Sequence, residues 1–183
     1  MNHRYAAFGL ALALTAVSAA RADDDFPRDG IKGDALNAAF RQKGITIFAP
    51  ADQPVVMMDS RYVYGGQSLA GARGDMVLVQ QGGHPCHYMM EFDAPIESFE
   101  FNRSRLIAGP NGITHPVWSA TAQDDRGATL SVVNEDEIRS YSDVPARRFT
   151  LTGPGIKRIL FWGDDKAFDA FCNVVIDSTT SYR

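Results

Sequence analysis

The sequence has little cysteine, no block of positive charge and no second long apolar run. Two cysteines in 183 residues exclude a small scaffold held by many disulfides and a cysteine-rich zinc module. After the apolar N-terminus, no stretch reaches the roughly 20 residues that a membrane-spanning helix needs. A net charge of −4 with scattered arginines argues against nucleic acid and anionic membranes as main partners.

Recognisable catalytic motifs are also missing. The chain contains no G-x-S-x-G elbow, no G-x-G-x-x-G fingerprint and no P-loop. Glu91 with Glu97, and Glu135 with Glu137, show no spacing that predicts an acid–base couple. The acidic run Glu135–Glu137 is typical of a solvated turn. These absences favour a non-catalytic protein over an enzyme.

The N-terminus has the pattern of an export signal. Arg4 precedes the uncharged run "AAFGLALALTAVSAA", and Ala20-Arg21-Ala22 forms an A-x-A cleavage pattern. We therefore expect residues 1–22 to be a signal peptide and the protein to be periplasmic or secreted. A membrane anchor is the weaker alternative, because the apolar run is short. Residues 23–33 are expected to be a flexible lead-in, and 34–183 a single domain.

One helix is predicted, in the segment "GDALNAAFRQKG" at 33–44. Asp34 can cap its start, and Gly44 is a natural C-terminal stop. Its expected apolar side consists of Leu36, Ala39 and Phe40. We interpret it as a short helix that covers one end of the core.

The rest of the chain has the pattern of many short β-strands separated by turns. Apolar residues alternate along these segments, which predicts that one face of each strand is buried. The expected inward residues are Tyr88, Met90, Phe92, Phe99, Phe101, Trp118, Ala120 and Ala122. Turn clusters such as "DDRG" and "TGPG" separate the strands. The predicted fold is mainly β, an antiparallel β-sandwich or jelly roll with one short N-terminal helix.

Several segments resemble a known group of proteins. "ATAQDDRGATL" resembles a strand, an Asp-Gly turn and a second strand; "FTLTGPGIKRILF" resembles two paired strands joined by a Gly-Pro-Gly turn; and "NVVID" resembles a closing strand. Together they are similar to secreted bacterial β-sandwich domains that look like galactose-binding-like and carbohydrate-binding jelly rolls. This resemblance implies a sandwich fold but specifies no ligand.

The segment "GGHPCHYMMEF" allows three interpretations. In an oxidising compartment Cys86 and Cys172 are expected to form one disulfide, which we favour. The second is a transition-metal site, for which His84 and His87 would have to meet the distant His115. The third is a Cys86 nucleophile with His87 as its base, which requires a free thiolate.

Acidic residues near the C-terminus are candidates for a calcium site. The resembled domains often hold a structural calcium near a chain end, which here would involve Asp164, Asp169 and Asp177. Against this, no D-x-D-x-D-G ladder is present, and aspartates are common in turns for backbone reasons. No other cofactor is expected.

A glycan-binding surface is the leading functional hypothesis. Sugars stack on aromatic rings flanked by planar polar groups, and the candidate ligand-binding residues are His115, Tyr141, Trp162, Asp164 and Asp165. Trp118 shares a face with two alanines and is expected in the core, whereas Trp162 is better placed to be exposed. The alternatives are a structural protein of the cell envelope or matrix without a small-molecule ligand, and a small metallohydrolase using His84, His87 and His115.

Overall fold

The computed structural model describes residues 30–59, 76–81, 86–103, 105–163, 171–177 and 181–182. The predicted signal peptide, Asp164, Asp165 and Asp169 lie outside these ranges. For residues 58, 59, 76, 77, 81, 86, 171–177, 181 and 182, the backbone alone is described. The fold is mainly β with one short helix, as the sequence predicts. None of the helices in the described ranges has the length and apolar character needed to cross a bilayer.

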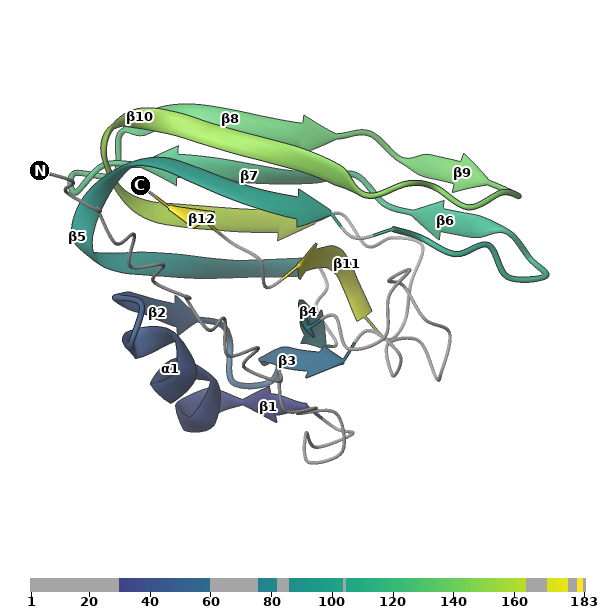
Figure 1. Ribbon diagram of the computed structural model, residues 1–183, viewed down its shortest axis with the longest axis horizontal. Coiled ribbons are helices and arrows are strands. Elements are labelled where there is room, and N and C mark those ends of the chain that lie inside the picture. Colours follow the sequence, from purple (N-terminus) through teal and green to yellow (C-terminus); the bar gives the residue numbers. More distant parts are fainter. Residues whose placement is uncertain are drawn as a thin grey trace, which may run out of the picture.

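The elements follow one another along the chain with a helix near the start and strands thereafter (Figure 1). They are β1 Ile31–Lys32, α1 Gly33–Arg41, β2 Ile45–Phe48, β3 Val55–Asp59, β4 Met76–Gln81, β5 Cys86–Arg103, β6 Ile113–His115, β7 Trp118–Gln123, β8 Thr129–Glu135, β9 Ile138–Ser140, β10 Arg147–Gly163, β11 Phe171–Asp177 and β12 Ser181–Tyr182. Every strand pairing between described residues is antiparallel.

Two long strands, β5 and β10, build both layers of the sandwich. The first part of β10 pairs with the last part of β5, through Phe149 opposite Phe101, and the last part of β10 pairs with the first part of β5, through Phe161 opposite Tyr88. Register shifts between Thr152 and Arg158 mark the bend. Both strands curve around at the left of Figure 1 and return. One continuous pair of strands therefore serves two layers.

The bend corrects two expectations from the sequence. The segments 87–93 and 96–102 form one strand rather than two, and Gly153-Pro154-Gly155 lies inside β10 rather than in a turn between paired strands. The two halves of β10 each pair with β5 and not with one another. Gly155 has a φ of 78°, which a residue with a side chain adopts with difficulty.

Each layer is completed by neighbouring strands. The first layer has the strand order β2, β5, β10, β7 and β8. In the second layer β5 pairs with β12 and β11, and β4, β3 and β1 extend the sheet from there. β6 and β9 form a separate two-stranded ribbon that extends beyond the sandwich at the right of Figure 1.

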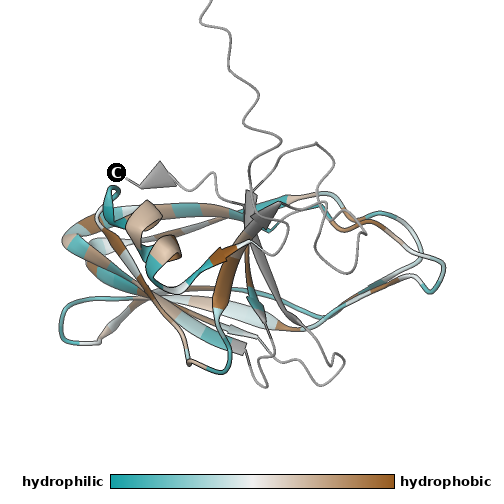
Figure 2. Ribbon diagram, turned by 90° about the horizontal axis from the view of Figure 1, so that it is seen from below, coloured by the Kyte–Doolittle hydropathy of each residue, from teal (hydrophilic) through white to brown (hydrophobic). Residues whose placement is uncertain are grey.

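Aromatic rings from the two layers meet in the core. The ring of Phe101 in the second layer lies 5.4 Å from that of Phe161 and 5.8 Å from that of Trp118, both in the first layer. Trp118 in turn lies 4.8 Å from Phe149. Figure 2 shows apolar and polar segments alternating along the strands, as expected when one face of each strand is buried. All eight inward residues named above are buried.

The helix matches its prediction in position but not in every detail. Leu36 and Phe40 are buried in the core, and Gly44 follows the helix with a φ of 68°. Ala39, expected on the buried side, is exposed. The N-cap is Lys32 rather than Asp34, with no capping hydrogen bond from its side chain. Asp34 instead lies in the first turn, where its charge interacts favourably with the helix dipole.

Candidate functional site

The outer face of the first layer carries apolar side chains that the core does not use. Phe48 in β2 lies opposite Met89 in β5, and Met89 lies opposite Leu160 in β10. His87, two residues before Met89, lies opposite Trp162. Because side chains two apart on a strand share a face, all five point to the same side of the sheet.

These residues form the lining of a groove on that face. Its volume is about 380 Å³, and it is lined by Phe48, Ala49, Pro50, His87, Tyr88, Met89, Leu160, Phe161 and Trp162. Phe48 is 48% exposed and Trp162 is 43% exposed. We call this the Phe48–Trp162 groove. Its volume falls within the range of small-molecule sites, which runs from about 300 to 1,000 Å³.

A packed layer of rings supports the groove from the core side. Tyr88 and Phe161 point inward and stack with their ring centroids 4.8 Å apart. Burial raises the pKa of the Tyr88 phenol well above its ordinary value, so the ring stays neutral. Because both rings are almost fully buried, the strands that carry His87 and Trp162 are held in place.

Polar side chains flank the apolar lining. His87 is exposed at the groove, and Ser119 in β7 lies opposite Trp162. Beyond the Met89–Leu160 row, on the side away from His87 and Ser119, Arg158 donates a hydrogen bond from Nε to Oε2 of Glu91 at 3.0 Å. The two charges are therefore paired with one another beside the groove.

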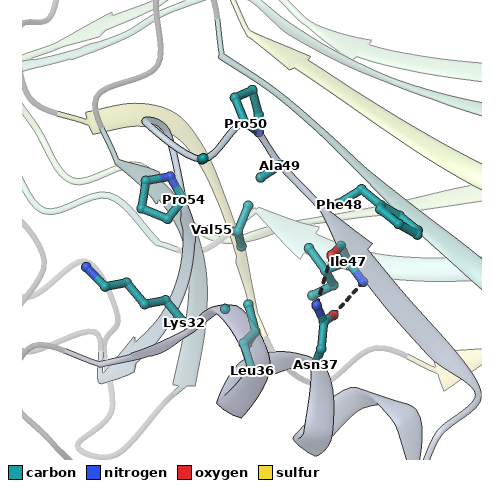
Figure 3. Close-up of a pocket in the computed structure, with 11 residues that line it drawn as sticks. Lys32, Leu36, Asn37, Ile47, Phe48, Ala49, Pro50, Pro54 and Val55 are labelled. Carbon is teal, nitrogen blue, oxygen red and sulfur yellow. Dashed lines mark hydrogen bonds between the residues drawn. The ribbon is translucent and has the colours of Figure 1, made fainter.

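A second cavity adjoins the groove beside α1 (Figure 3). It has a volume of about 410 Å³ and shares Phe48, Ala49 and Pro50 with the Phe48–Trp162 groove. Asn37 from α1 meets the edge of β2, where its Oδ1 accepts from the Ile47 N–H at 2.8 Å and its Nδ2 donates to the Ile47 carbonyl at 3.3 Å. Lys32 supplies a positive charge to the lining.

The residues predicted to bind a ligand do not gather at one site. Trp162 lines the groove, whereas Tyr141 is 88% exposed after β9, where it lies against Gly112. A Cβ on Gly112 would stand 3.1 Å from the Tyr141 ring, so the glycine lets the ring approach the turn. Asp164 and Asp165 lie outside the described residues, so their role stays a prediction.

His115 is buried rather than presented to solvent. It is 2% exposed at the end of β6, with its Nδ1 3.2 Å from the carbonyl oxygen of Pro116. Although burial raises the pKa of Glu135, hydrogen bonds from Arg103 and Trp118 and the charge of Arg103, with a smaller contribution from His115, hold that pKa below its ordinary value. Because a direct ligand contact requires an accessible ring, we leave His115 out of the proposed site.

The predicted metal sites remain expectations. Within the described ranges, no three side chains of histidine, cysteine, aspartate or glutamate come close enough to hold a metal ion. His84 and Asp169 lie outside those ranges, and only the backbone of Asp177 is described. His87 is exposed on the outer face of the sheet, whereas His115 is buried at the end of β6.

Glu135 shows a further departure from the sequence prediction. It was expected in a solvated acidic turn, but it is 6% exposed and forms an ion pair with Arg103 at 2.9 Å. Phe48, Met89 and Leu160 line the groove but were not among the predicted site residues. The alternation of apolar residues could have indicated Phe48, because it is out of phase with the buried Ile45 and Ile47 and so lies on the opposite face of the strand.

No protein-family model matches the sequence, and no curated protein matches it. Among solved structures, the chain is similar to the enzymatically active domain of bacteriophage CBA120 tailspike protein 4, at 12% identity and a TM-score of 0.38, over 76% of this chain and 19% of that one. It is similar to an arabinose-bound GH51 α-L-arabinofuranosidase, at 11% identity and a TM-score of 0.40, over 85% and 25% of the two chains.

A third similar structure is a GH31 CBM32 module bound to GalNAc. It has 16% identity and a TM-score of 0.36, over 75% of this chain and 95% of that one. The chain thus spans about a fifth of the tailspike chain and a quarter of the arabinofuranosidase chain. At identities and TM-scores this low, we draw no conclusion about function from these similarities.

Proposed function

We propose that this chain is an exported, non-catalytic binding module that holds a glycan in the Phe48–Trp162 groove. One observation carries the proposal: two large aromatic side chains, each nearly half exposed, line the same groove. A folded protein gains by burying such rings, so a groove that exposes two of them is a candidate interaction site.

The chemistry of the groove suits a sugar. One face of a pyranose ring presents C–H groups, which pack on the flat surface of an indole or phenyl ring. The rigid ring of Trp162 offers a large contact area with little loss of side-chain entropy. The exposed imidazole of His87 can donate to or accept from a sugar hydroxyl at the edge of the groove.

A binding role fits the groove better than glycoside hydrolysis. Hydrolysis of a glycosidic bond generally uses two carboxyl groups, one on each side of the bond. The described residues that line the groove include no aspartate or glutamate. Glu91, two residues after Met89 on the same strand, is held in its ion pair with Arg158.

The test compares matched aromatic variants on a glycan array and by calorimetry. Trp162→Ala and Phe48→Ala should each weaken binding at least about tenfold, which corresponds to about 1.4 kcal/mol. Trp162→Phe should keep part of the affinity, because a smaller ring remains. Tyr141→Ala is the control, since Tyr141 is exposed after β9 and does not line the groove. Circular dichroism melting checks that each variant is folded.

Two results would contradict the proposal. The first is a parent protein that binds no glycan on a broad array. The second is a glycan bound with unchanged affinity by Trp162→Ala and Phe48→Ala but lost in Tyr141→Ala, which would place binding at the turn after β9.

A further inference from the structure

The outer face of the first layer continues beyond the groove as two rows of side chains that cross the strands. The first row passes from Phe48 to Met89, Leu160, Thr121 and Val132, each directly opposite the next. Since Cα partners in an antiparallel sheet share a face, these side chains point the same way. Val132, at the far end, is 55% exposed.

The second row runs beside the first. It passes from His87 to Trp162, Ser119 and Asn134, again through directly opposite partners. All four can make hydrogen bonds through an imidazole, an indole N–H, a hydroxyl or an amide. A mainly apolar row, in which Thr121 is the one polar member, thus lies alongside a row of hydrogen-bonding side chains that also offers the Trp162 ring for stacking, over β5, β10, β7 and β8.

The rows form an extended track. Four steps between five strands, at about 4.8 Å each, give the first row a length of about 19 Å. One strand spacing is close to the length of one pyranose unit in an extended chain. Among the described strands, β8 ends the sheet path, so none of them lies beyond Val132.

The two rows carry few charged groups. None of their described side chains is an aspartate, glutamate, lysine or arginine. In the flanking row Glu91 and Arg158 pair with one another, at side-chain exposures of 34% and 31%. A track without net charge offers no electrostatic preference for an acidic polymer.

We propose that the ligand is a neutral, linear polysaccharide bound along its interior, lying across the strands from the Phe48–Trp162 groove to Val132 and Asn134. This inference rests on the proposed function and adds the class of glycan. Sugar faces pack on the apolar row, while hydroxyl groups on one edge of the chain meet the polar row. Each added sugar therefore finds another pair of side chains until the track ends.

The experiment measures affinity against chain length. The probes are cellobiose, cellotetraose and cellohexaose, with the matching xylo- and manno-oligosaccharides, in isothermal titration calorimetry. In at least one series the hexasaccharide should bind at least about tenfold more tightly than the disaccharide. Val132→Asp should weaken binding of that hexasaccharide about tenfold and leave the disaccharide within twofold.

Thr129→Asp is the matched control. It adds the same charge to another exposed position of β8, opposite Gln123 and outside the two rows. It should leave both ligands unchanged. Asn134→Ala should also weaken binding of the hexasaccharide and not of the disaccharide, by a smaller factor than Val132→Asp does.

The outcomes separate this inference from the proposed function. Equal affinity for disaccharide and hexasaccharide, or equal effects of Val132→Asp on both, overturns the extended track but leaves a glycan site in the groove. If none of these neutral oligosaccharides binds, the inference is overturned. Binding of a different glycan on the array would then still support the proposed function.

Discussion

Arg103 and Glu135 form a buried ion pair that joins the end of β5 to the end of β8. Arg103 donates from Nε to Oε2 at 2.9 Å and from Nη2 to Oε1 at 3.2 Å. Its remaining nitrogen donates to the Pro145 carbonyl at 2.8 Å, and the indole of Trp118 donates to the same carboxylate at 3.0 Å. The pair therefore ties the second layer to the first at the end away from the bend.

We predict that Glu135→Ala strongly destabilises the fold. The substitution leaves the Arg103 charge buried without its carboxylate, and breaking a buried pair costs about 3–5 kcal/mol. Urea unfolding followed by circular dichroism measures the change. Glu137→Ala is the matched control: its partner Arg139 is exposed, so the free energy of unfolding should change little. Equal effects of the two substitutions would contradict the buried role of Glu135.

Acid should weaken the fold partly through Glu135. Burial raises its pKa, but hydrogen bonds from Arg103 and Trp118 and the charges of Arg103 and His115 outweigh that effect, so its pKa lies below the ordinary value of 4.5. A carboxyl group whose pKa is lowered by folding stabilises the native state above its unfolded pKa. That contribution is lost as the pH falls below about 4.5 and through the folded value.

The measurement is the free energy of unfolding between neutral pH and pH 3, compared with that of Glu135→Gln. The amide keeps an acceptor for Trp118 but does not titrate. The variant should be less stable than the parent near neutral pH, and the gap should narrow as the pH falls. A constant gap over the whole range would show that Glu135 does not contribute to acid sensitivity.

Two glycines in the bend of β10 should respond differently to substitution. A Cβ on Gly153 would lie 2.8 Å from the Cβ of Leu130, so Gly153→Ala requires the backbone to shift and should cost about 1–3 kcal/mol. At Gly155 a Cβ meets nothing within 4 Å, and the cost comes from its φ of 78°. Gly155→Asn should then be milder than Gly155→Ala, because asparagine tolerates this conformation better. Thermal unfolding of the three variants tests this order.

Asn37 protects the edge of β2. Its amide satisfies both backbone groups of Ile47, which would otherwise be open to another strand. Asn37→Ala should lower the free energy of unfolding by about 1–3 kcal/mol. It should also promote self-association, which sedimentation velocity at increasing protein concentration measures. Asn37→Asp keeps the acceptor for the Ile47 N–H but loses the donor, so its effect should be intermediate. A monomeric Asn37→Ala variant at high concentration would contradict the protective role.

The disulfide between Cys86 and Cys172 stays a prediction, because the side chains of both cysteines lie outside the described part of the structure. Cys172 lies opposite Gln80, and the Gln80 amide donates to the carbonyl of His87, next to Cys86, at 2.9 Å. Thiol titration of the exported protein under denaturing conditions should find no free thiol. Replacing both cysteines with serine should then cost about 2–5 kcal/mol. A count of two free thiols would show that the disulfide does not form.

The sequence predicted the faces of the strands more reliably than their extents. Alternation alone placed Trp118 and Phe101 in the core, because period-two burial is a local property. The continuity of β10 through Gly153-Pro154-Gly155 was not predictable in this way. Those residues are typical of a turn, and only the distant pairing with β5 carries the strand across them.

The site was predictable in part. Trp162 was expected to be exposed and is, because it lies out of phase with Phe161. Glu135 was misplaced, because its neighbours are acidic and its partner Arg103 lies 32 positions away. The groove itself depends on which strands adjoin β5, and β2 comes from a distant part of the chain. Local pattern carries no information about such neighbours.

The shared bend of β5 and β10 has a mechanical consequence. In a sandwich of separate strands, the sheets can slide apart by breaking side-chain contacts alone. Here the peptide backbone itself runs from one sheet into the other in two neighbouring strands. A load applied to a polymer held on the outer face would pass along covalent bonds into the opposite sheet, and shearing the sheets apart would require the paired backbone of the bend to open first.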